Sequence, residues 1–553
     1  MLASAAQDPA RSPTSPPGRG VIAGRVVDTK GAGVPNAEIM IGGPSGWMHR
    51  ADGASFTRRV ITDEHGDFAF AALPAGEYEF SVSKSGYLTA MYNQRRPYGQ
   101  PDSVPLRDGE RRLDVTITLP KLSVITGTVT DETGAAISAV WVTAVRPVVR
   151  GGVWQLQRVV SAGTDDRGEY RLSRLEPGHY AIVIRDTQSL VIADPDGAGT
   201  RLLAYAPVMH PPTAAGMDRR DLIRIDPGQE QTGVDLRIAR VPAARLTGTV
   251  SGIEGEGITS LTLRSSGDTL FAEGLGSRVM SVHPDGTFSL DGVLPGRYVL
   301  SAIRTELKGG MLAGRVWTAT QSVIVGTADV PDVSLTLRRS PNLSGRLVFD
   351  GAAPPPDAAA LQNNFRVRTE SADGNFEQGE PRQTLAFPEF SVTGFLPGSY
   401  LVRPPEQFGA WRLRGATLEG REVSAMPLEV GTVDIGDIVI TYTDRGTKLS
   451  GVARSAGGAL QRDTFVAVFP TDSRLWVDYG SKPRRLLGIQ AEADGTFTID
   501  LPAGEYFVVA TPDDIRDAWQ ERSMLTRLAG GAARVVVREG DEARVNPPMV
   551  TVR

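Results

Sequence analysis

A pair of motifs that recurs five times constrains this chain more than any other feature. The first motif is an apolar-Gly-x-apolar segment, with its glycine at Gly24, Gly127, Gly248, Gly345 and Gly451. The second motif ends in Gly-x-Tyr, with its tyrosine at Tyr78, Tyr180, Tyr298, Tyr400 and Tyr506. In each pair the glycines of the two motifs are 48 to 53 residues apart. Spacing held this closely indicates five domains of one kind, each of about 100 residues.

Apolar and polar residues alternate on both sides of each tyrosine. In the first copy Phe68 and Phe70 precede the tyrosine, and Phe80 and Val82 follow it. This period of two is typical of strands with one buried face. We expect the tyrosine ring to pack inward and its hydroxyl to bond to nearby main chain, as at the tyrosine corner of Greek-key sandwiches. A final alternating strand is expected in each copy, such as Leu113, Val115, Ile117 and Leu119 in the first.

Together these patterns predict an all-β chain of five tandem Greek-key β-sandwich domains. Residues 1–20 are expected to be a disordered leader or signal-peptide remnant, and the sandwiches, called repeats one to five below, to span residues 21–121, 122–241, 242–339, 340–444 and 445–553. Tight turns such as Asp63-Glu64-His65-Gly66 join the strands. Repeat four is degenerate, because Pro388 stands where the Asp-Gly turn should be. One short helix is expected, in repeat five, between Pro512 and Leu528.

The repeated unit resembles the carboxypeptidase regulatory-like domain. The shared marks are Gly-x-Val-x-Asp at residues 24–28 and 127–131, an Asp-Gly turn and a Pro-Gly-x-Tyr corner. The resemblance covers nearly the whole chain from residue 21 and implies a transthyretin-like, seven-stranded sandwich, also grouped with carbohydrate-binding-like and Ig-like folds. It implies secreted or surface proteins of bacteria. It implies no catalytic residue, because this domain carries none of its own even where it accompanies a peptidase domain.

Composition excludes several kinds of chemistry. The chain has no Cys and five His, and none of the His stands in a metal-ligand or catalytic spacing. A net charge of −5 lacks the basic footprint of a nucleic-acid-binding protein. We therefore predict no enzyme activity, no catalytic residue, no cofactor, no metal site and no nucleic-acid partner. Calcium at the acidic turns, such as Asp165, Asp166 and Glu169, stays an alternative to plain hairpin turns.

The N-terminus bears on location. Residues 1–7 look like the tail of a secretory signal, with Ala3-Ser4-Ala5 as a small-x-small cleavage site, and an ordinary Ala-rich N-terminus is the alternative. No apolar run is long enough to form a transmembrane helix. We expect an extracytoplasmic protein (secreted, periplasmic or on the cell surface) that is a monomer and has no membrane span.

The segments after each corner tyrosine vary in length and carry aromatic residues. Loops on a rigid sandwich are where ligands usually bind, and exposed aromatic rings stack on sugars. The candidate ligand contacts are Tyr92, Tyr98, Tyr205, Trp317 and Trp411. The first hypothesis is a structural or adhesive array. The alternative is a string of carbohydrate- or polymer-binding modules that use these aromatics, with a polysaccharide or a surface protein as partner.

Overall fold

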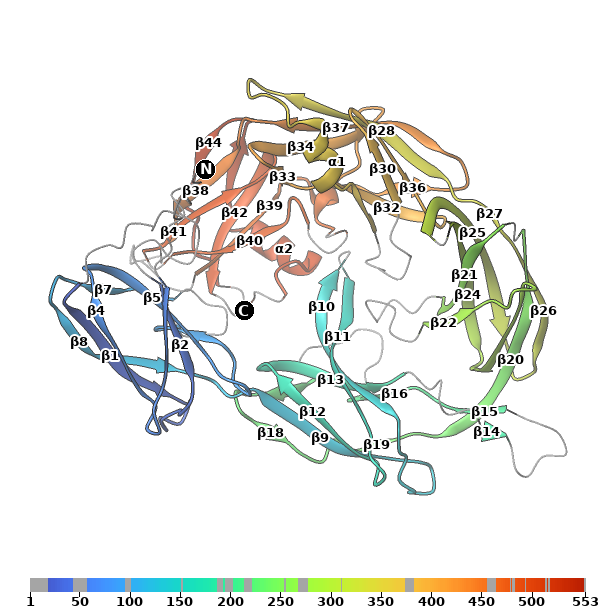
Figure 1. The fold of residues 1–553 in the computed structure, drawn as a ribbon, viewed down its shortest axis with the longest axis horizontal. Helices are drawn as coiled ribbons and strands as arrows, with labels where there is room; N and C mark the ends of the chain where they lie inside the picture. Colours follow the sequence, from blue (N-terminus) through green and yellow to red (C-terminus); the bar gives the residue numbers. More distant parts are fainter. Residues whose placement is uncertain are drawn as a thin grey trace, which may run out of the picture. The chain divides into compact units, whose positions relative to one another are not determined.

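The computed structural model confirms an all-β chain (Figure 1). It describes residues 18–42, 57–94, 101–150, 153–185, 192–193, 202–212, 221–252, 255–266, 277–309, 311–372, 382–454, 464–477, 479, 483–492, 494–512, 515 and 518–551. The residues in these ranges form ten sheets and two α-helices. Contacts divide the chain into two compact units, one of residues 1–123 with 226–229 and one of residues 124–225 with 230–553.

Repeat one folds as two sheets around one core. The first sheet has the order β4 (Asp67–Leu73), β1 (Gly20–Val27), β8 (Arg111–Thr118). The second contains β3 (Thr57–Ile61), β2 (Glu38–Gly42) and β5 (Gly76–Ser83), with β6 (Ala90–Met91) and β7 (Val104–Leu106) both paired to β5. Strand β1 runs antiparallel to β4 and parallel to β8. The buried side chains between the sheets include Ile22, Tyr78 and Phe80.

Repeats two and three vary this arrangement. The strands of repeat two are β9 (Ser123–Thr130), β10 (Trp141–Arg150), β11 (Val153–Gly163), β12 (Glu169–Leu175), β13 (Gly178–Ile184), β14 (Ile192–Ala193), β15 (Leu202–Tyr205), β16 (Val208–His210), β17 (Ile223–Ile225), β18 (Glu230–Gln231) and β19 (Leu236–Arg237). Those that follow are β20 (Arg240–Ser251), β21 (Gly257–Ser265), β22 (Arg278–Ser281), β23 (Thr287–Val293), β24 (Gly296–Lys308), β25 (Met311–Val325), β26 (Val330–Thr336) and β27 (Arg338–Arg339). Strands β14 and β15 extend the sheet of β20.

Repeats four and five complete the chain. Repeat four has β28 (Asn342–Asp350), β29 (Arg368–Ser371), β30 (Arg382–Ala386), β31 (Glu389–Thr393), β32 (Gly398–Arg403), β33 (Gln407–Phe408), β34 (Trp411–Leu418), β35 (Arg421–Glu422), β36 (Leu428–Val430) and β37 (Ile435–Thr443). Repeat five has β38 (Lys448–Val452), β39 (Thr464–Pro470), β40 (Leu487–Gln490), β41 (Thr496–Asp500), β42 (Gly504–Pro512), β43 (Ala533–Val537) and β44 (Glu542–Arg544), with a 3-10 turn at Ser473–Leu475. The hydrophobic clusters each lie within one of the five repeats.

The helix predicted in repeat five is present but shorter than expected. It is α2 (Arg522–Ala529), and Leu525 and Leu528 on it are fully buried. Trp519 precedes the helix and is also buried, beside Phe465. Repeat four contains a second helix, α1 (Ala358–Asn364), which the sequence analysis missed. Asp357 caps α1 by accepting a hydrogen bond from Ala360 N, and seven residues are too few to show a helical period.

The first repeated glycine lies where the first strand of each repeat meets its last strand. A β-carbon on Gly24 would lie 1.8 Å from Val115 O, and in the other four repeats the corresponding distance to the facing carbonyl oxygen is 1.7 to 1.9 Å. No side chain fits there. In repeat one the parallel register of β1 and β8 shifts between Ile22 and Gly24, which forms a β-bulge. The bulge turns Leu113 outward, so only the later members of the predicted alternating strand are buried.

The Asp-Gly turns also face the first strand. Val26 N donates to Gly66 O over 2.8 Å, and the same bond recurs at Gly168, Gly286 and Gly495. Repeat four lacks the Asp-Gly sequence, yet Leu347 N donates to Pro388 O over the same 2.8 Å. The turn at Pro388, which follows a cis peptide bond, therefore supplies the carbonyl that the Asp-Gly turn supplies elsewhere.

The tyrosine corner is confirmed in all five repeats. Each hydroxyl donates to the carbonyl oxygen four residues earlier, over 2.7 to 2.9 Å. In repeat one this bond joins Tyr78 Oη to Pro74 O, and the Tyr78 side chain is fully buried. The second repeated motif is thus structural, because the tyrosine hydroxyl bonds its strand to the turn that precedes it.

We expect Gly127→Ala to destabilise repeat two by about 1–3 kcal/mol or more, because the new methyl group would overlap Val234 O. Hydrogen exchange of the β9 amides, followed by mass spectrometry, measures the effect. Gly163→Ala in the same repeat is the matched control, since a β-carbon there meets nothing within 4 Å. Equal protection of β9 in the two variants would contradict this account.

The buried corner tyrosines should make the fold sensitive to alkali. Desolvation raises the pKa of Tyr78, Tyr298 and Tyr506 above the ordinary value. Because the folded pKa lies above the unfolded one, this contribution to stability is complete below pH ~10 and is lost as the pH rises beyond it. We expect tyrosinate absorbance of the folded chain to appear at higher pH than in denaturant. Coinciding titrations would refute this.

Candidate functional site

Aspartate side chains of the repeated turns accept hydrogen bonds from the main chain of the same turns. Asp63 Oδ1 accepts hydrogen bonds from His65 N and Asp67 N, and Asp165 Oδ1 does the same for Arg167 N and Glu169 N. Within the described ranges, no group of three or more His, Cys, Asp or Glu side chains is placed to hold a metal ion. We therefore find no support for calcium at these turns in that part of the chain.

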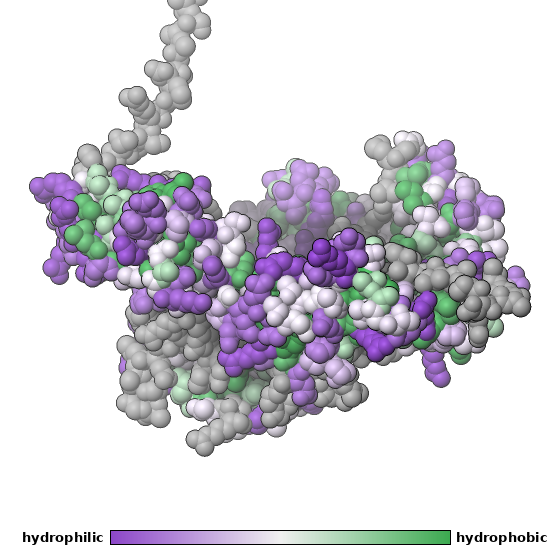
Figure 2. All heavy atoms as spheres, turned by 90° about the horizontal axis from the view of Figure 1, so that it is seen from below, coloured by the Kyte–Doolittle hydropathy of each residue, from purple (hydrophilic) through white to green (hydrophobic). Residues whose placement is uncertain are grey.

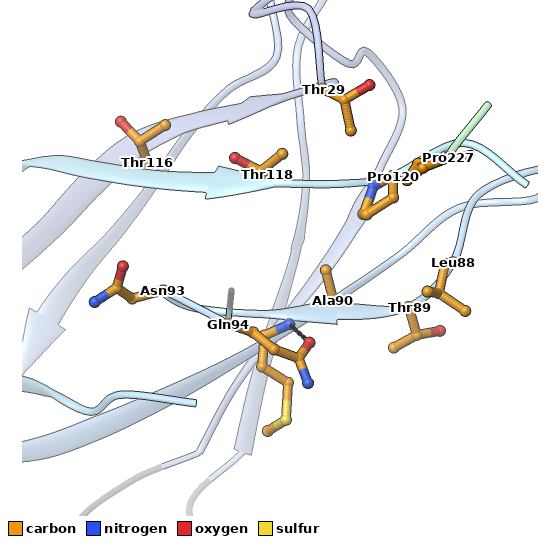
Figure 3. A pocket seen from close by; sticks show the side chains of 11 residues that line it. Thr29, Leu88, Thr89, Ala90, Asn93, Gln94, Thr116, Thr118, Pro120 and Pro227 are labelled. Carbon is orange, nitrogen blue, oxygen red and sulfur yellow. Dashed lines mark hydrogen bonds between the residues drawn. The ribbon is translucent and has the colours of Figure 1, made fainter. Parts of the chain in front are cut away.

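A groove of about 430 Å³ opens in repeat one and is the candidate binding site (Figure 3). Figure 3 shows Thr116 and Thr118 of β8 on one side, across from the segment that carries Ala90 and Asn93. The groove thus lies between an outer strand of each sheet, β8 and β6. Its volume falls in the range of about 300–1,000 Å³ typical of ligand sites.

The groove is uncharged and lined by both polar and apolar side chains in the part that the structure describes. Six side chains with hydroxyl or amide groups line it: Thr29, Thr89, Asn93, Gln94, Thr116 and Thr118. The remaining lining residues are apolar, among them Leu88 and Ala90, which are buried. None of the described lining residues is aromatic or ionisable. Such a surface favours an uncharged ligand that exchanges hydrogen bonds.

Two of the five predicted ligand contacts have their rings in the core. Trp411 is 2% exposed, packs edge-on against Phe349 at 5.0 Å between ring centroids, and donates from Nε1 to Pro354 O. Tyr205 is 3% exposed and belongs to the core of repeat two. These two aromatic residues of the variable segments therefore complete the cores of their repeats.

The other three predicted contacts have different positions. Tyr92 is half-buried and lies 6.3 Å from the Phe80 ring, against the core of repeat one. Trp317 is half-buried against the core of repeat three. Tyr98 lies outside the described residues. A ligand role for these three stays a prediction, and the structure does not bring Tyr92 or Trp317 into the groove lining.

Repeats four and five meet at a buried arginine that sequence reasoning did not single out. The Arg484 side chain is 2% exposed. It donates to Glu406 Oε1 (2.7 Å), Ser424 Oγ (2.6 Å) and Leu413 O (3.0 Å), all in repeat four. The only sign in the sequence is the Arg484-Arg485 pair, which resembles the other arginine pairs of the chain.

Further polar contacts join repeats four and five. Arg412 Nη1 lies 2.8 Å from Asp500 Oδ2, and Arg414 contacts Glu539. Arg403 Nη2 donates to Tyr479 O over 2.8 Å. These bonds cross the boundary at residue 444 from several segments. Repeats four and five are therefore held together by more than the peptide that connects them.

Hydrophobic residues do not form a wide patch on the face that Figure 2 shows, where they lie in small, separate areas. Large exposed apolar side chains such as Ile61, Ile324 and Val433 belong to different repeats. No helix in the described ranges has the length and apolar character needed to cross a bilayer.

We expect Arg484→Ala to weaken the junction by about 1–3 kcal/mol, because three partners in repeat four lose a charged donor. Faster hydrogen exchange in β34 and β40 would report it. Arg474→Ala is the matched control, since that side chain is 85% exposed and pairs with nearby Asp472. Unchanged exchange in the Arg484 variant would show that the junction does not depend on this residue.

The first part of the chain matches a known domain family. Residues 21–120 and 124–190 match the family model of the carboxypeptidase regulatory-like domain. The family model thus matches the first part of the chain in two consecutive segments, consistent with a tandem array and with the resemblance found in the residues of repeats one and two. The search of curated proteins gives no match to this chain.

Several solved structures resemble the chain in part. The minor pilin GBS52 of Streptococcus agalactiae is 12% identical over 40% of this chain and 96% of its own, with a TM-score of 0.22. The shaft pilin SpaA of Lactobacillus rhamnosus GG is 12% identical over 40% and 97%, also with a TM-score of 0.22. The Bacillus anthracis TIE protein is 9% identical over 96% and 72%, with a TM-score of 0.16. At these TM-scores the likeness carries no argument about function.

Proposed function

We propose that this chain is a non-catalytic structural or adhesive protein of the extracytoplasmic space, built as an array of five sandwich domains. The observation that carries the proposal is the use of the repeated residues. In every repeat the glycine, the corner tyrosine and the turn carbonyl make the same contacts with the main chain. These recurrent residues serve the fold, and within the described ranges no repeat adds a catalytic constellation to them.

The contacts at two boundaries between repeats favour an array that can bear load. The expected boundary between repeats two and three, at Val241 and Pro242, lies inside β20, where Val241 pairs with Ala204 of β15. Next to it, Arg240 Nε donates to Glu132 Oε1 over 2.7 Å. At the expected boundary between repeats four and five, Asp444 Oδ2 accepts hydrogen bonds from Ala352 N and Ala353 N, and these bonds lower the pKa of that carboxyl group. Both boundaries are therefore held by neighbouring structure.

Location, partner and oligomeric state belong to the proposal. An extracytoplasmic place rests on the small-x-small segment at Ala3-Ser4-Ala5 and on the family resemblance. The expected partner is a surface protein or a polysaccharide, and the chain is expected to act as a monomer. The alternative use of exposed aromatics for sugar binding loses support, because Tyr205 and Trp411 are buried.

Stretching single molecules of the full chain by atomic force microscopy tests the array. Five domains of about 100 residues predict five separate unfolding events, each lengthening the chain by roughly 350 Å when extended at 3.3–3.6 Å per residue. In the Arg484→Ala variant we expect the same number of events. A single event, or extension without resolved steps, would contradict a load-bearing array of five domains.

A further inference from the structure

The groove of repeat one exposes an unpaired strand edge. Strand β8 ends its three-stranded sheet, with β1 on one side and no strand on the other among the described residues. The open edge ends with β8, because just beyond it Pro120 O accepts a hydrogen bond from Leu88 N over 2.8 Å. Leu119, just after β8, donates its N–H to Val27 O over 2.7 Å. Since neighbouring residues in a parallel ladder point their main-chain groups to opposite sides, those of Thr116 and Thr118 point away from β1. Both residues line the groove.

In repeat four the same edge is occupied by a strand. Ile438 of β37 faces Gly345 as Val115 of β8 faces Gly24, so Val439 and Thr441 correspond to Thr116 and Thr118. Strand β34 runs antiparallel to β37 and pairs Thr417 with Val439 and Gly415 with Thr441. This repeat therefore shows that an extended segment fits beside the last strand of the sandwich.

The two repeats differ because their post-corner segments take different routes. In repeat four the segment after the corner strand supplies β34 to the sheet of β37. In repeat one the equivalent segment supplies β6, which pairs with β5 in the opposite sheet. The edge of β8 is thus left beside a groove, while that of β37 is covered by the chain itself.

We propose that the groove of repeat one binds an extended peptide segment of a partner protein, which pairs antiparallel with β8 as β34 pairs with β37. The main-chain groups of Thr116 and Thr118 supply the hydrogen bonds, and side-chain contacts in the groove select the sequence. Residues of the peptide that face inward are small or apolar and uncharged, like Leu413 and Ala416 of β34, which are buried. No aromatic residue is among the described lining residues, so a sugar would lack a stacking platform.

A peptide copied from β34 tests the proposal. The probe is the fluorescein-labelled octapeptide Trp-Arg-Leu-Arg-Gly-Ala-Thr-Leu, the sequence of residues 411–418, titrated with the full chain by fluorescence anisotropy. We expect saturable binding that weakens at least about tenfold in Thr116→Pro, because proline has no N–H and its ring projects into the groove. Thr116→Val keeps the N–H and keeps binding.

Two further variants serve as controls for this experiment. Ser334→Pro changes the equivalent position of β26 in repeat three and should bind the probe normally, which separates the groove from strand edges in general. Thr89→Trp fills the groove from an exposed position and should abolish binding even if Thr116→Pro fails to fold, which circular dichroism would reveal.

Three results would overturn the proposal. One is the absence of saturable binding by the unchanged chain up to about 1 mM, the weak end of specific affinities. Another is equal binding by the folded Thr116→Pro and Thr89→Trp variants. The third is a concentration-dependent dimer of the chain alone that Thr116→Pro dissolves in sedimentation experiments, because the groove would then belong to a second copy.

Discussion

The close approach of a carbonyl oxygen to the first repeated glycine is the contact on which each sandwich depends. It lets the last strand lie directly against the first, in parallel, and in repeats one, three and four the register shifts at the crossing, as at a β-bulge. The bulge sets which side chains of the last strand face inward, as the outward Leu113 beside the inward Val115 shows. The corner tyrosine and the turn carbonyl then fix the strands on either side of that pair. A side chain at the glycine would disturb the strand pair, the corner tyrosine and the turn carbonyl together.

Much of this could be predicted from the residues, because the repeat is encoded locally. The alternation of apolar and polar residues around the corners, the turn residues and the constant spacing all indicate the same sandwich. The tyrosine hydroxyl forms the hydrogen bond that was expected. The reason for the glycine could not be seen, since it is a contact with a strand about 90 residues away. Repeat four looked degenerate because a proline replaced the Asp-Gly turn, although only its carbonyl oxygen is needed.

The candidate site was harder to predict than the fold. Exposed aromatic rings were expected in the variable segments, but whether a ring there faces solvent or the core is decided by how the segment returns to the sheets. Trp411 lies on the strand that covers β37, so its ring became part of the core of repeat four. The groove of repeat one is made of threonines and amides that carry no sequence motif, and Arg484 looks like any surface arginine until its partners are seen.

The parallel pairing of first and last strands has a mechanical consequence. In repeat one the chain enters at the start of β1 and leaves at the end of β8, and the two strands point the same way. A pull on the two ends therefore slides these strands along each other. The hydrogen bonds between the strands are then loaded at the same time and do not break one after another. Repeats three, four and five have the same parallel pair. The resistance of such an array to tension is set by shear of this one ladder, repeated along the chain.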